Sequence, residues 1–260
     1  MSMDNQRNIY ENPRMWGKRL PQTVLERAEL TTMSVPTDVR TILEVGSGDG
    51  LIIDELRKAG YDPVALDLSY NALGHINTMK RVQGQASQLP FSPNCFDLVL
   101  CCELLEHIPD SIFQKVLNEI GNIAGKYIIV TVPYQEKLEW NSARCHACGC
   151  IFNGAYHLRS FNENDLKFLF RGFRCGSLRG IVHVLHPDRT LALELFIRHQ
   201  LASEYLYYSP SANCPLCSTP IDKRPNRNWV GWIAAGIRYF YRLINRQKSP
   251  LWYLAIYQKS

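Results

Sequence analysis

The sequence of 260 residues contains no long apolar run. No stretch approaches the roughly 20 uninterrupted apolar residues that a membrane-spanning helix needs. The first residues, MSMDNQRNIYENPRMWGK, show no basic segment followed by an apolar core, as a secretory signal would. No internal repeat or low-complexity tract occurs. Together with an ordinary composition, 46% hydrophobic and 20% charged, these absences predict a globular cytoplasmic protein. Thiols stay reduced in that compartment, so nine cysteines favour metal binding or buried thiols over disulfides.

The net charge of +5 is concentrated near one end of the chain. From Pro220 onward there are eight basic residues and one acidic residue, a net charge of +7, so the remaining residues together carry −2. A basic, aromatic-rich stretch lies in this part, NWVGWIAAGIRYFYRLINRQ at 228–247. It predicts a helix with Arg238, Arg242 and Arg246 on one stripe and apolar residues on another.

Short β-branched apolar segments alternate with amphipathic ones. We expect strands at 41–46, 62–69, 80–86, 96–104 and 126–134, and helices at 49–60, 70–81 and 110–124. Such alternation predicts a parallel sheet covered by helices on both faces. The pattern stops at a cysteine-rich segment, resumes with a helix at 162–173 and a strand at 173–182, and ends in a strand at 250–259. The sequence therefore predicts one α/β domain with two insertions.

These elements suggest a division of the chain. We expect an N-terminal helical cap (1–37), a cofactor-binding core (38–134), an insertion with a first cysteine pair (135–160), a core helix and strand (161–182), an insertion with a second cysteine pair and the basic helix (183–249), and a last core strand (250–260).

The stretch EVGSGDG places Gly46, Gly48 and Gly50 between a strand and a helix, where backbone often approaches a ligand closely. Glu44 stands just before this loop, where a carboxylate would repel a pyrophosphate but suit a cationic ligand. Asp67 ends the second strand 21 residues after Gly46, a common place for a carboxylate that binds ribose. The pattern favours a positively charged nucleoside, although an ordinary strand-to-helix turn also explains the glycines alone.

Four stretches, ILEVGSGDG, VALDLS, GQASQLPFSPNCFDLVLCCELLEHIPD and YIIVTVP, resemble class I S-adenosylmethionine-dependent methyltransferases. The resemblance covers roughly residues 38–134 and the closing strands. It implies a doubly wound, mostly parallel seven-stranded sheet with an antiparallel last strand. It also implies cofactor contacts from Gly46, Ser47, Gly48 and Gly50 (methionine portion), Asp67 (ribose), Leu68, Gln85, Ala86 and Ser87 (adenine), and Cys102 and Glu103 (pocket end). Gln85 departs from the family, which often has an acidic residue there.

Methyl transfer from a sulfonium needs mainly alignment of the reacting atoms, but a hydroxyl acceptor also needs a base. His107, Glu103 and His157 are the candidates, and each has a structural alternative. The chain has Cys101-Cys102-Glu103-Leu104 after the fourth strand. It therefore lacks the Asn/Asp-Pro-Pro-Tyr/Phe run of enzymes that methylate base amines, and the Pro-Cys nucleophile of cytosine C5 enzymes.

Cys145-x-x-Cys148 and Cys214-x-x-Cys217 supply the four thiolates of a structural zinc site. The 65 residues between the pairs exceed the usual spacing, so the zinc would join the two insertions into a small subdomain. Unrelated buried thiols are the alternative. Cys150 and His146 are substitute ligands, whereas Cys95, Cys101, Cys102 and Cys175 have the pattern of core residues.

These features together predict an S-adenosylmethionine-dependent methyltransferase that acts on an oxygen of a small-molecule or glycan acceptor, including a lipid-linked one. An RNA methyltransferase that uses the zinc site and the basic segment is a second hypothesis, and a non-catalytic cofactor-binding scaffold is a third. The basic helix covers the core, contacts the anionic inner face of a membrane, or forms a lid over an anionic or lipid-linked acceptor. Nucleic acid is the less favoured partner, because no known nucleic-acid-binding module accompanies the helix. The sequence leaves the oligomeric state open.

Overall fold

The computed structural model describes residues 3–187, 212–221, 228–244 and 246–260. These residues divide between two compact units. The first unit comprises Met1–Glu136, Arg159–Val182 and Leu251–Ser260, and the second comprises Lys137–Leu158 and His183–Pro250. Each unit is described separately below.

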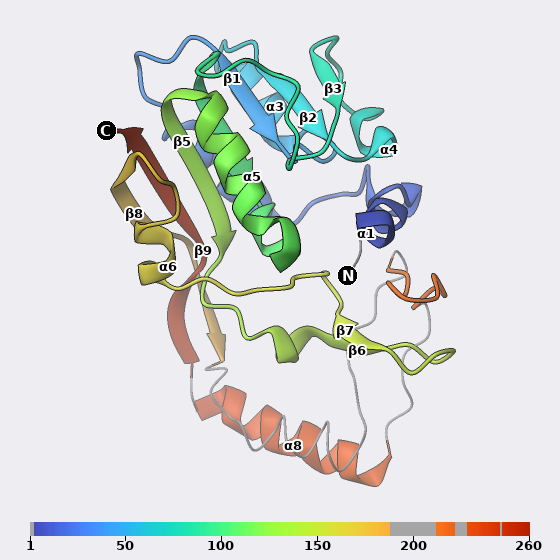
Figure 1. The fold of residues 1–260 in the computed structure, drawn as a ribbon. Helices are drawn as coiled ribbons and strands as arrows, with labels where there is room; N and C mark the ends of the chain where they lie inside the picture. Colours follow the sequence, from blue (N-terminus) through green and yellow to red (C-terminus); the bar gives the residue numbers. More distant parts are fainter. Residues whose placement is uncertain (1–2, 188–211, 222–227, 245) are drawn as a thin grey trace. The chain divides into compact units, whose positions relative to one another are not determined.

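The first unit contains a seven-stranded sheet with the strand order β3-β2-β1-β4-β5-β9-β8 (Figure 1). The strands are β1 (Ile42–Val45), β2 (Val64–Asp67), β3 (Arg81–Gln83), β4 (Phe96–Cys102), β5 (Ala124–Pro133), β8 (Phe173–Pro187) and β9 (Arg246–Lys259). The first five strands run parallel, and β9 pairs antiparallel with β5. The predicted fold class, a mostly parallel seven-stranded sheet with an antiparallel last strand, is confirmed.

Helices cover the sheet on both sides. The helices of the first unit are α1 (Met3–Tyr10), α2 (Gln22–Thr32), α3 (Leu51–Lys58), α4 (Tyr70–Leu73), α5 (Asp110–Ile123) and α6 (Glu163–Lys167), with short 3₁₀ turns at Pro13–Met15 and Leu105–His107. Alternate residues of β4 face opposite sides, as the pleat requires. Leu98 and Leu100 pack with residues of α2 and α3, whereas Val99 and Cys101 pack with residues of α5. The central strands are therefore buried on both faces, which explains their continuous apolar sequences.

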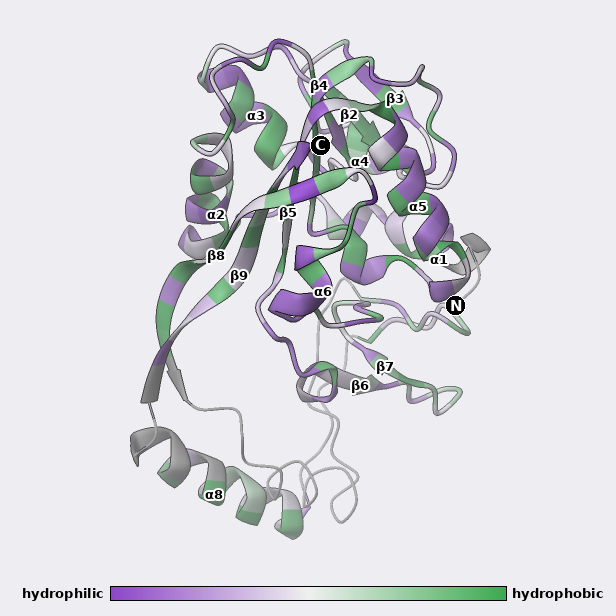
Figure 2. Cartoon of the chain, turned by 60° about the vertical axis from the view of Figure 1, so that its left-hand side comes forward, coloured by the Kyte–Doolittle hydropathy of each residue, from purple (hydrophilic) through white to green (hydrophobic). Residues whose placement is uncertain are grey.

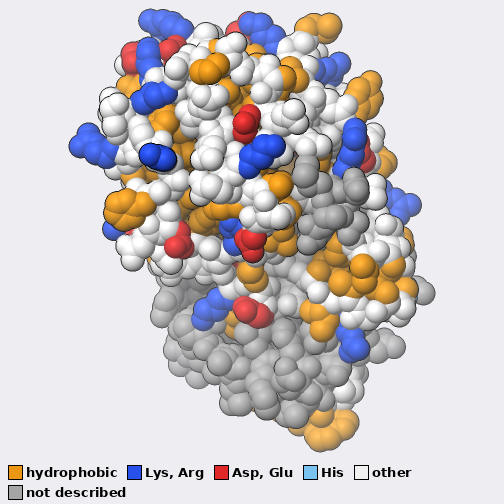
Figure 3. All heavy atoms as spheres, in the orientation of Figure 1, with side chains coloured by type: hydrophobic (Ala, Val, Ile, Leu, Met, Phe, Trp, Pro, Cys, Tyr) orange, Lys and Arg blue, Asp and Glu red, His pale blue; other side chains and the backbone are white. Residues whose placement is uncertain are grey.

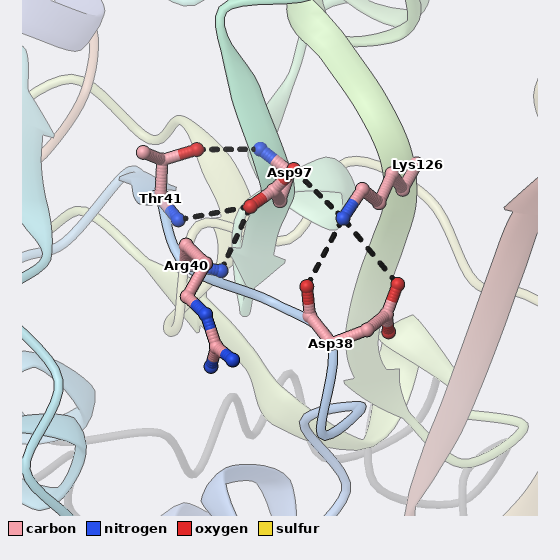
Figure 4. Close-up of polar contacts among 5 residues, drawn as sticks. All are labelled: Asp38, Arg40, Thr41, Asp97 and Lys126. Atoms are coloured by element: carbon pink, nitrogen blue, oxygen red, sulfur yellow. Dashed lines mark hydrogen bonds and ion pairs between the residues drawn. The ribbon is translucent and has the colours of Figure 1, made fainter.

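The amino ends of the central strands are joined by a cluster of charged side chains (Figure 4). The Asp97 carboxylate of β4 accepts hydrogen bonds from the backbone N–H groups of Arg40 (2.8 Å) and Thr41 (3.2 Å). Lys126 of β5 lies 3.2 Å from Asp97 and 3.4 Å from Asp38. Burial acts to raise the pKa of Asp97, but these hydrogen bonds outweigh it and lower that pKa. The cluster fixes the entry into β1, at the edge of the sheet opposite its carboxyl ends.

The structure shortens two predicted helices. The helix expected at 162–173 ends at Lys167. Residues 70–81 were expected to be helical, but α4 ends at Leu73. The Arg81 guanidinium donates hydrogen bonds to the carbonyl oxygens of Leu73 (2.9 Å) and Ile76 (3.0 Å). These bonds satisfy carbonyl groups that a longer helix would have used, and Ile76 is buried beside Ile53. Tertiary contacts therefore override the helical pattern in this segment.

The second unit contains a 3₁₀ turn (Leu138–Asn141), a two-stranded antiparallel sheet of β6 (Ser142–Arg144) and β7 (Ile151–Asn153), and the helix α8 (Trp229–Ile244). The chain enters this unit after β5 and again within β8, at His183. Among the residues that the structure describes, none of the helices is both long and apolar enough to cross a membrane.

Candidate functional site

The loop between β1 and α3 has a backbone that requires glycine. Gly46, Gly48 and Gly50 have φ angles of 76°, 54° and 92°, in the left-handed region that other residues rarely adopt. A Cβ atom on Gly46 would lie 2.8 Å from Leu104, and one on Gly50 would lie 2.8 Å from Ile76. The loop therefore packs closely against Leu104 and Ile76. Its three glycines leave a stretch of bare backbone at the carboxyl end of β1.

Two buried carboxylates flank this loop. Glu44 is 2% exposed, and its Oε2 atom has no hydrogen-bond partner. Burial raises its pKa well above the usual value, Asp67 and Asp49 raise it further, and Arg27 opposes them. Asp67 accepts hydrogen bonds from the backbone N–H groups of Gly48 and Ser69, both at 2.8 Å. Burial raises the pKa of Asp67 too, against these bonds. Asp67 thereby ties the glycine loop to the end of β2.

The residues expected around the adenine lie at the carboxyl ends of β2 and β3. The Gln83 amide donates to the Leu68 carbonyl (3.1 Å), and the Gly84 N–H donates to the Asp67 carbonyl (2.9 Å). Gln85 is exposed, Ala86 packs against the core, and Ser87 is buried. These residues therefore form a continuous border beside the glycine loop.

Glu103 begins the loop after β4 with a positive φ of 53°. Its carboxylate accepts a hydrogen bond from the Trp252 indole N–H (2.7 Å) and lies 3.5 Å from the Arg27 guanidinium. Arg27 is buried and also donates to the Thr131 hydroxyl (3.2 Å). Cys102, directly before Glu103, is buried, and burial raises its pKa to about 12. This thiol is therefore neutral at physiological pH, and the Glu103 side chain is engaged with Arg27 and Trp252.

The sequence analysis missed Glu106. Its side chain is fully buried, and both of its carboxylate oxygens lack a hydrogen-bond partner. Burial raises its pKa well above the usual value, and the neighbouring Glu103 raises it further. A carboxylate oxygen of Glu106 and a ring nitrogen of His107 lie within 4.8 Å of each other. The sequence did contain one sign of a buried carboxylate, namely the charged Glu106 inside the apolar stretch LLEHI.

The first unit thus contains every predicted cofactor-site residue together with Glu103 and His107, at or near the carboxyl ends of β1 to β4. His157 belongs to the second unit, where its backbone N–H donates to the Asn153 side chain (3.4 Å). In the first unit, Glu44, Glu103 and Glu106 share one buried cation, Arg27. Burial makes the charged forms of Glu44 and Glu106 costly, and Arg27 offsets part of that cost.

The second unit brings together the four predicted zinc ligands. The Sγ atoms of Cys145 and Cys217 lie 3.5 Å apart, and those of Cys148 and Cys214 lie 3.6 Å apart. All four sulfur atoms lie within 4.8 Å of one another. A tetrahedral site with zinc–sulfur bonds of about 2.3 Å has sulfur atoms about 3.8 Å apart. The four thiols are therefore arranged as a four-thiolate metal site requires.

Both cysteine pairs have the same turn geometry. The N–H of Gly149 donates to the Cys145 carbonyl (3.0 Å), and the N–H of Ser218 donates to the Cys214 carbonyl (2.9 Å). Each turn then closes with a second hydrogen bond, from Cys145 to Cys150 and from Cys214 to Thr219. Gly149 and Ser218 have positive φ angles of 75° and 59°. Two matching turns that present paired thiols indicate one shared ligand rather than chance proximity.

The remaining cysteines differ in burial. Cys101 and Cys102 are buried, as expected for core residues, and Cys175 is half-buried. Cys95 is exposed, so its assignment to the core was wrong. It lies just before β4 and follows three exposed residues, 92–94, whereas the next residue, Phe96, is buried. Cys150 lies outside the group of four sulfur atoms.

Comparison with known proteins identifies the first unit. Residues 43–124 match the family model described as a methyltransferase domain. Over 95 residues the chain is 36% identical to an uncharacterized protein of Methanocaldococcus jannaschii, a match that covers 35% of this chain and 40% of that protein. It is 39% identical over 80 residues to the ubiquinone biosynthesis O-methyltransferase of Methylococcus capsulatus, with 27% and 34% covered. The chain therefore spans less than half the length of these relatives.

Solved structures share the fold over most of the chain. A S-adenosylmethionine-dependent methyltransferase of Archaeoglobus fulgidus has a TM-score of 0.53 at 15% identity, with 92% of this chain and 95% of that chain covered. A possible histamine N-methyltransferase of Thermotoga maritima has a TM-score of 0.54 at 14% identity, with both chains fully covered. Residues 43–124 thus match a methyltransferase domain, and the fold is that of S-adenosylmethionine-dependent methyltransferases, as the sequence resemblance predicted.

Proposed function

We propose that the protein transfers a methyl group from S-adenosylmethionine to an oxygen of a small-molecule or glycan acceptor. The observation that carries the proposal is the buried Glu44 carboxylate, with one unpartnered oxygen, beside a glycine loop whose backbone has no room for side chains. An ammonium or sulfonium group would offset the cost of burying that carboxylate, whereas a pyrophosphate would increase it. The methyltransferase family match supports the same cofactor.

Some residues of the site would bind the cofactor, and another would remove a proton from the acceptor. Glu44 and the glycine loop would hold the methionine portion of the cofactor, and Asp67 would hold its ribose. The cofactor supplies a methyl group that its sulfonium already activates, so the protein must align an acceptor and remove one proton. His107 is the best placed base, because it lies in the first unit just after β4, with a carboxylate oxygen of Glu106 within 4.8 Å of its ring. Glu103 has a structural role instead, since it binds Arg27 and Trp252.

The acceptor class rests on two observations. Curated relatives that match the core are named ubiquinone biosynthesis O-methyltransferases. The loop after β4 reads CCELLEH and thus lacks the motif of enzymes that methylate base amines. Incubating the purified protein with a cell extract and methyl-labelled cofactor, followed by mass spectrometry, would identify the acceptor directly. Labelling confined to RNA would replace this proposal with the RNA methyltransferase hypothesis.

We also propose that Cys145, Cys148, Cys214 and Cys217 bind one zinc ion. Zinc accepts four thiolates in a tetrahedral arrangement, and the distances and the paired turns described above fit it. Four protein ligands leave no open coordination position, so the ion would be structural. The Tyr156 hydroxyl, which donates to the Asn213 carbonyl and accepts from its N–H at 2.8 Å each, already connects the two cysteine segments. A zinc ion would join these segments far more strongly, because each segment would supply two of its four thiolate ligands.

We further propose that α8 contacts an anionic membrane surface. Its described side chains place aromatic and aliphatic residues at the surface: Trp229 is 75% exposed, Trp232 63% and Phe240 67%, while Ala234 is buried. Green dominates the described part of this helix in Figure 2.

Residues 229–259 include five basic residues and no acidic one. By contrast, basic and acidic side chains both occur on the face of the first unit shown in Figure 3. Arg246 begins β9 rather than continuing α8, so its predicted place on the helical stripe was wrong. The side chains of Arg238 and Arg242 lie outside those described, so their place on the stripe remains a prediction. Exposed tryptophans with neighbouring positive charge are typical of interfacial helices.

The cofactor assignment predicts the outcome of calorimetry. S-adenosylhomocysteine should bind the wild-type protein, and Asp67→Ala should weaken binding at least about tenfold, because it removes both a ribose ligand and the anchor of the Gly48 N–H. Asp62→Ala, which removes an exposed carboxylate paired with Lys80, should bind as the wild type does. Tighter binding of a nicotinamide dinucleotide than of S-adenosylhomocysteine would contradict the assignment.

The base assignment predicts a separation of binding from turnover. His107→Ala should lower the rate of labelled methyl incorporation by roughly 100-fold or more, the usual effect of losing a general base, with little change in cofactor affinity. His183→Ala, at an exposed position of the second unit, should be unaffected. An unchanged rate in His107→Ala would show that another group, or none, removes the proton.

The metal assignment predicts a stoichiometry. Protein purified under reducing conditions without chelator should contain about one zinc ion per chain. Cys145→Ser and Cys214→Ser should both lose it and unfold at lower temperature, since each removes one ligand of the same ion. Cys150→Ser, a neighbouring thiol outside the group, should retain the metal. Metal-free protein of undiminished thermal stability would exclude the site.

The membrane assignment predicts salt-dependent sedimentation with vesicles. Vesicles of mixed phosphatidylglycerol and phosphatidylcholine should pull the protein down at low salt, and the triple variant R238Q/R242Q/R246Q should remain in solution. The variant K167Q/R171Q/R174Q, which removes three exposed basic residues of the first unit, should still sediment. Trp232→Ser should weaken sedimentation more than Phe168→Ser. Wild-type protein that binds RNA but no anionic vesicle would assign the surface to nucleic acid.

A further inference from the structure

The segment before α2, residues 3–17, binds three loops of the candidate cofactor site. This N-terminal segment contains α1 and the 3₁₀ turn at Pro13–Met15. It lies in the first unit together with the loops that it contacts, and Figure 1 shows α1 near α4. Neither the sequence pattern nor the family match at 43–124 includes it in the site.

Glu11 attaches the segment to the loop after β2. Its carboxylate accepts hydrogen bonds from the backbone N–H groups of Tyr70 (3.0 Å) and Asn71 (3.2 Å), and from the Ser69 hydroxyl (3.3 Å). The Asn71 amide also donates to the Glu11 side chain (3.0 Å) and backbone (2.8 Å). Burial acts to raise the pKa of Glu11, but the hydrogen bonds outweigh it and lower that pKa. Glu11 is thus an ionised anchor for residues 69–71, which directly follow Asp67 and Leu68.

Trp16 and Gly17 attach the segment to the glycine loop. The Gly17 N–H donates to the Asp49 carboxylate (3.0 Å). Gly17 has a φ of 68°, and a Cβ atom there would lie 2.7 Å from the His75 ring. The Trp16 ring lies 3.2 Å from the position that a Cβ atom on Gly48 would occupy, and the indole N–H donates to the Tyr10 carbonyl (2.8 Å). An indole ring is therefore held in place against the backbone expected to hold the methionine portion.

The helix α1 contacts the third loop. The Gln6 amide donates to the His107 carbonyl (2.5 Å), and the Tyr10 ring meets the His107 ring edge to face, with centroids 5.8 Å apart. One segment thus contacts the glycine loop, the loop expected to bind ribose and adenine, and the residue proposed as the base. A ligand that binds between these loops would therefore lie beside this segment.

We propose that the N-terminal segment completes the cofactor site, with Trp16 as a wall of the pocket and Glu11 as the positioning residue that holds the segment closed. This inference rests on the proposed function. Polar contacts at the edges of the segment hold it closed, because Glu11, Gln6 and Gly17 bond to backbone or to side chains of the loops, while Ile9 is the buried apolar residue of α1. Such contacts open without unfolding the sheet, so the segment controls how fast the demethylated product leaves.

Stopped-flow measurement of S-adenosylhomocysteine release, followed by tryptophan fluorescence, tests this inference. Glu11→Gln removes the charge and one strong acceptor, and should speed release about tenfold. Trp16→Ala should weaken binding and abolish most of the fluorescence change that accompanies it. Glu29→Gln and Phe168→Ala alter an exposed carboxylate and an exposed aromatic residue of the same unit, and should release product at the wild-type rate.

The outcomes separate this inference from the function on which it rests. If the wild-type protein does not bind S-adenosylhomocysteine, the proposed function fails first. If it binds, and both Glu11→Gln and Trp16→Ala retain wild-type affinity and release rate, the function stands and the role of the segment is refuted. Thermal unfolding should be nearly unchanged in Glu11→Gln, because a general loss of stability would accelerate release without any specific role. Release that is fast in Glu11→Gln and normal in Glu29→Gln, at equal unfolding temperatures, would support the inference.

Discussion

The buried guanidinium of Arg27 is the counter-charge on which the carboxyl edge of the sheet depends. Isolated carboxylates are costly to bury. Here Glu44, Glu103 and Glu106 come from β1 and the loop after β4, and Arg27 reaches them from α2. The same guanidinium bonds Thr131 of β5 and lies 5.3 Å from the centroid of the Trp252 ring of β9. One cation thereby links a helix to four strands or their loops. Burial still raises the pKa of Glu44 and Glu106 well above the usual value, so Arg27 offsets only part of the cost of their charged forms.

Sequence reasoning succeeded where function and local geometry impose the same residues. Gly46, Gly48 and Gly50 adopt backbone angles that only glycine adopts easily, so their spacing reports a conformation directly. The alternation of strands and helices likewise identified the sheet, because a strand buried on both faces needs a continuous apolar sequence. The match of residues 43–124 to the methyltransferase family confirmed that interpretation.

It failed where side chains distant in sequence decide the outcome. Nothing local shows that Arg81 ends α4 at Leu73, or that Arg27 faces carboxylates 17 to 79 residues away. Glu106 was overlooked because a single glutamate in an apolar stretch has the pattern of a solvated position, whereas the structure buries it completely. The contacts of Glu11 with residues near 70 are equally invisible in a pattern. The cysteine pairs were an exception, since a strict ligand spacing reveals a partner across 65 residues.

The position of β9 has a consequence for how the sheet assembles. β9 lies between β5 and β8, yet it follows both of them in the chain. During synthesis β1 to β5 can pair as soon as they emerge, but β8 has no neighbour until residues 246–259 have been made. The edge of β5 and the whole of β8 therefore wait as unpaired strands while roughly sixty residues of the second unit are translated, at about 5–20 residues per second. A nascent chain of this protein would expose two open strand edges for several seconds, the kind of surface that chaperones bind and that aggregation uses.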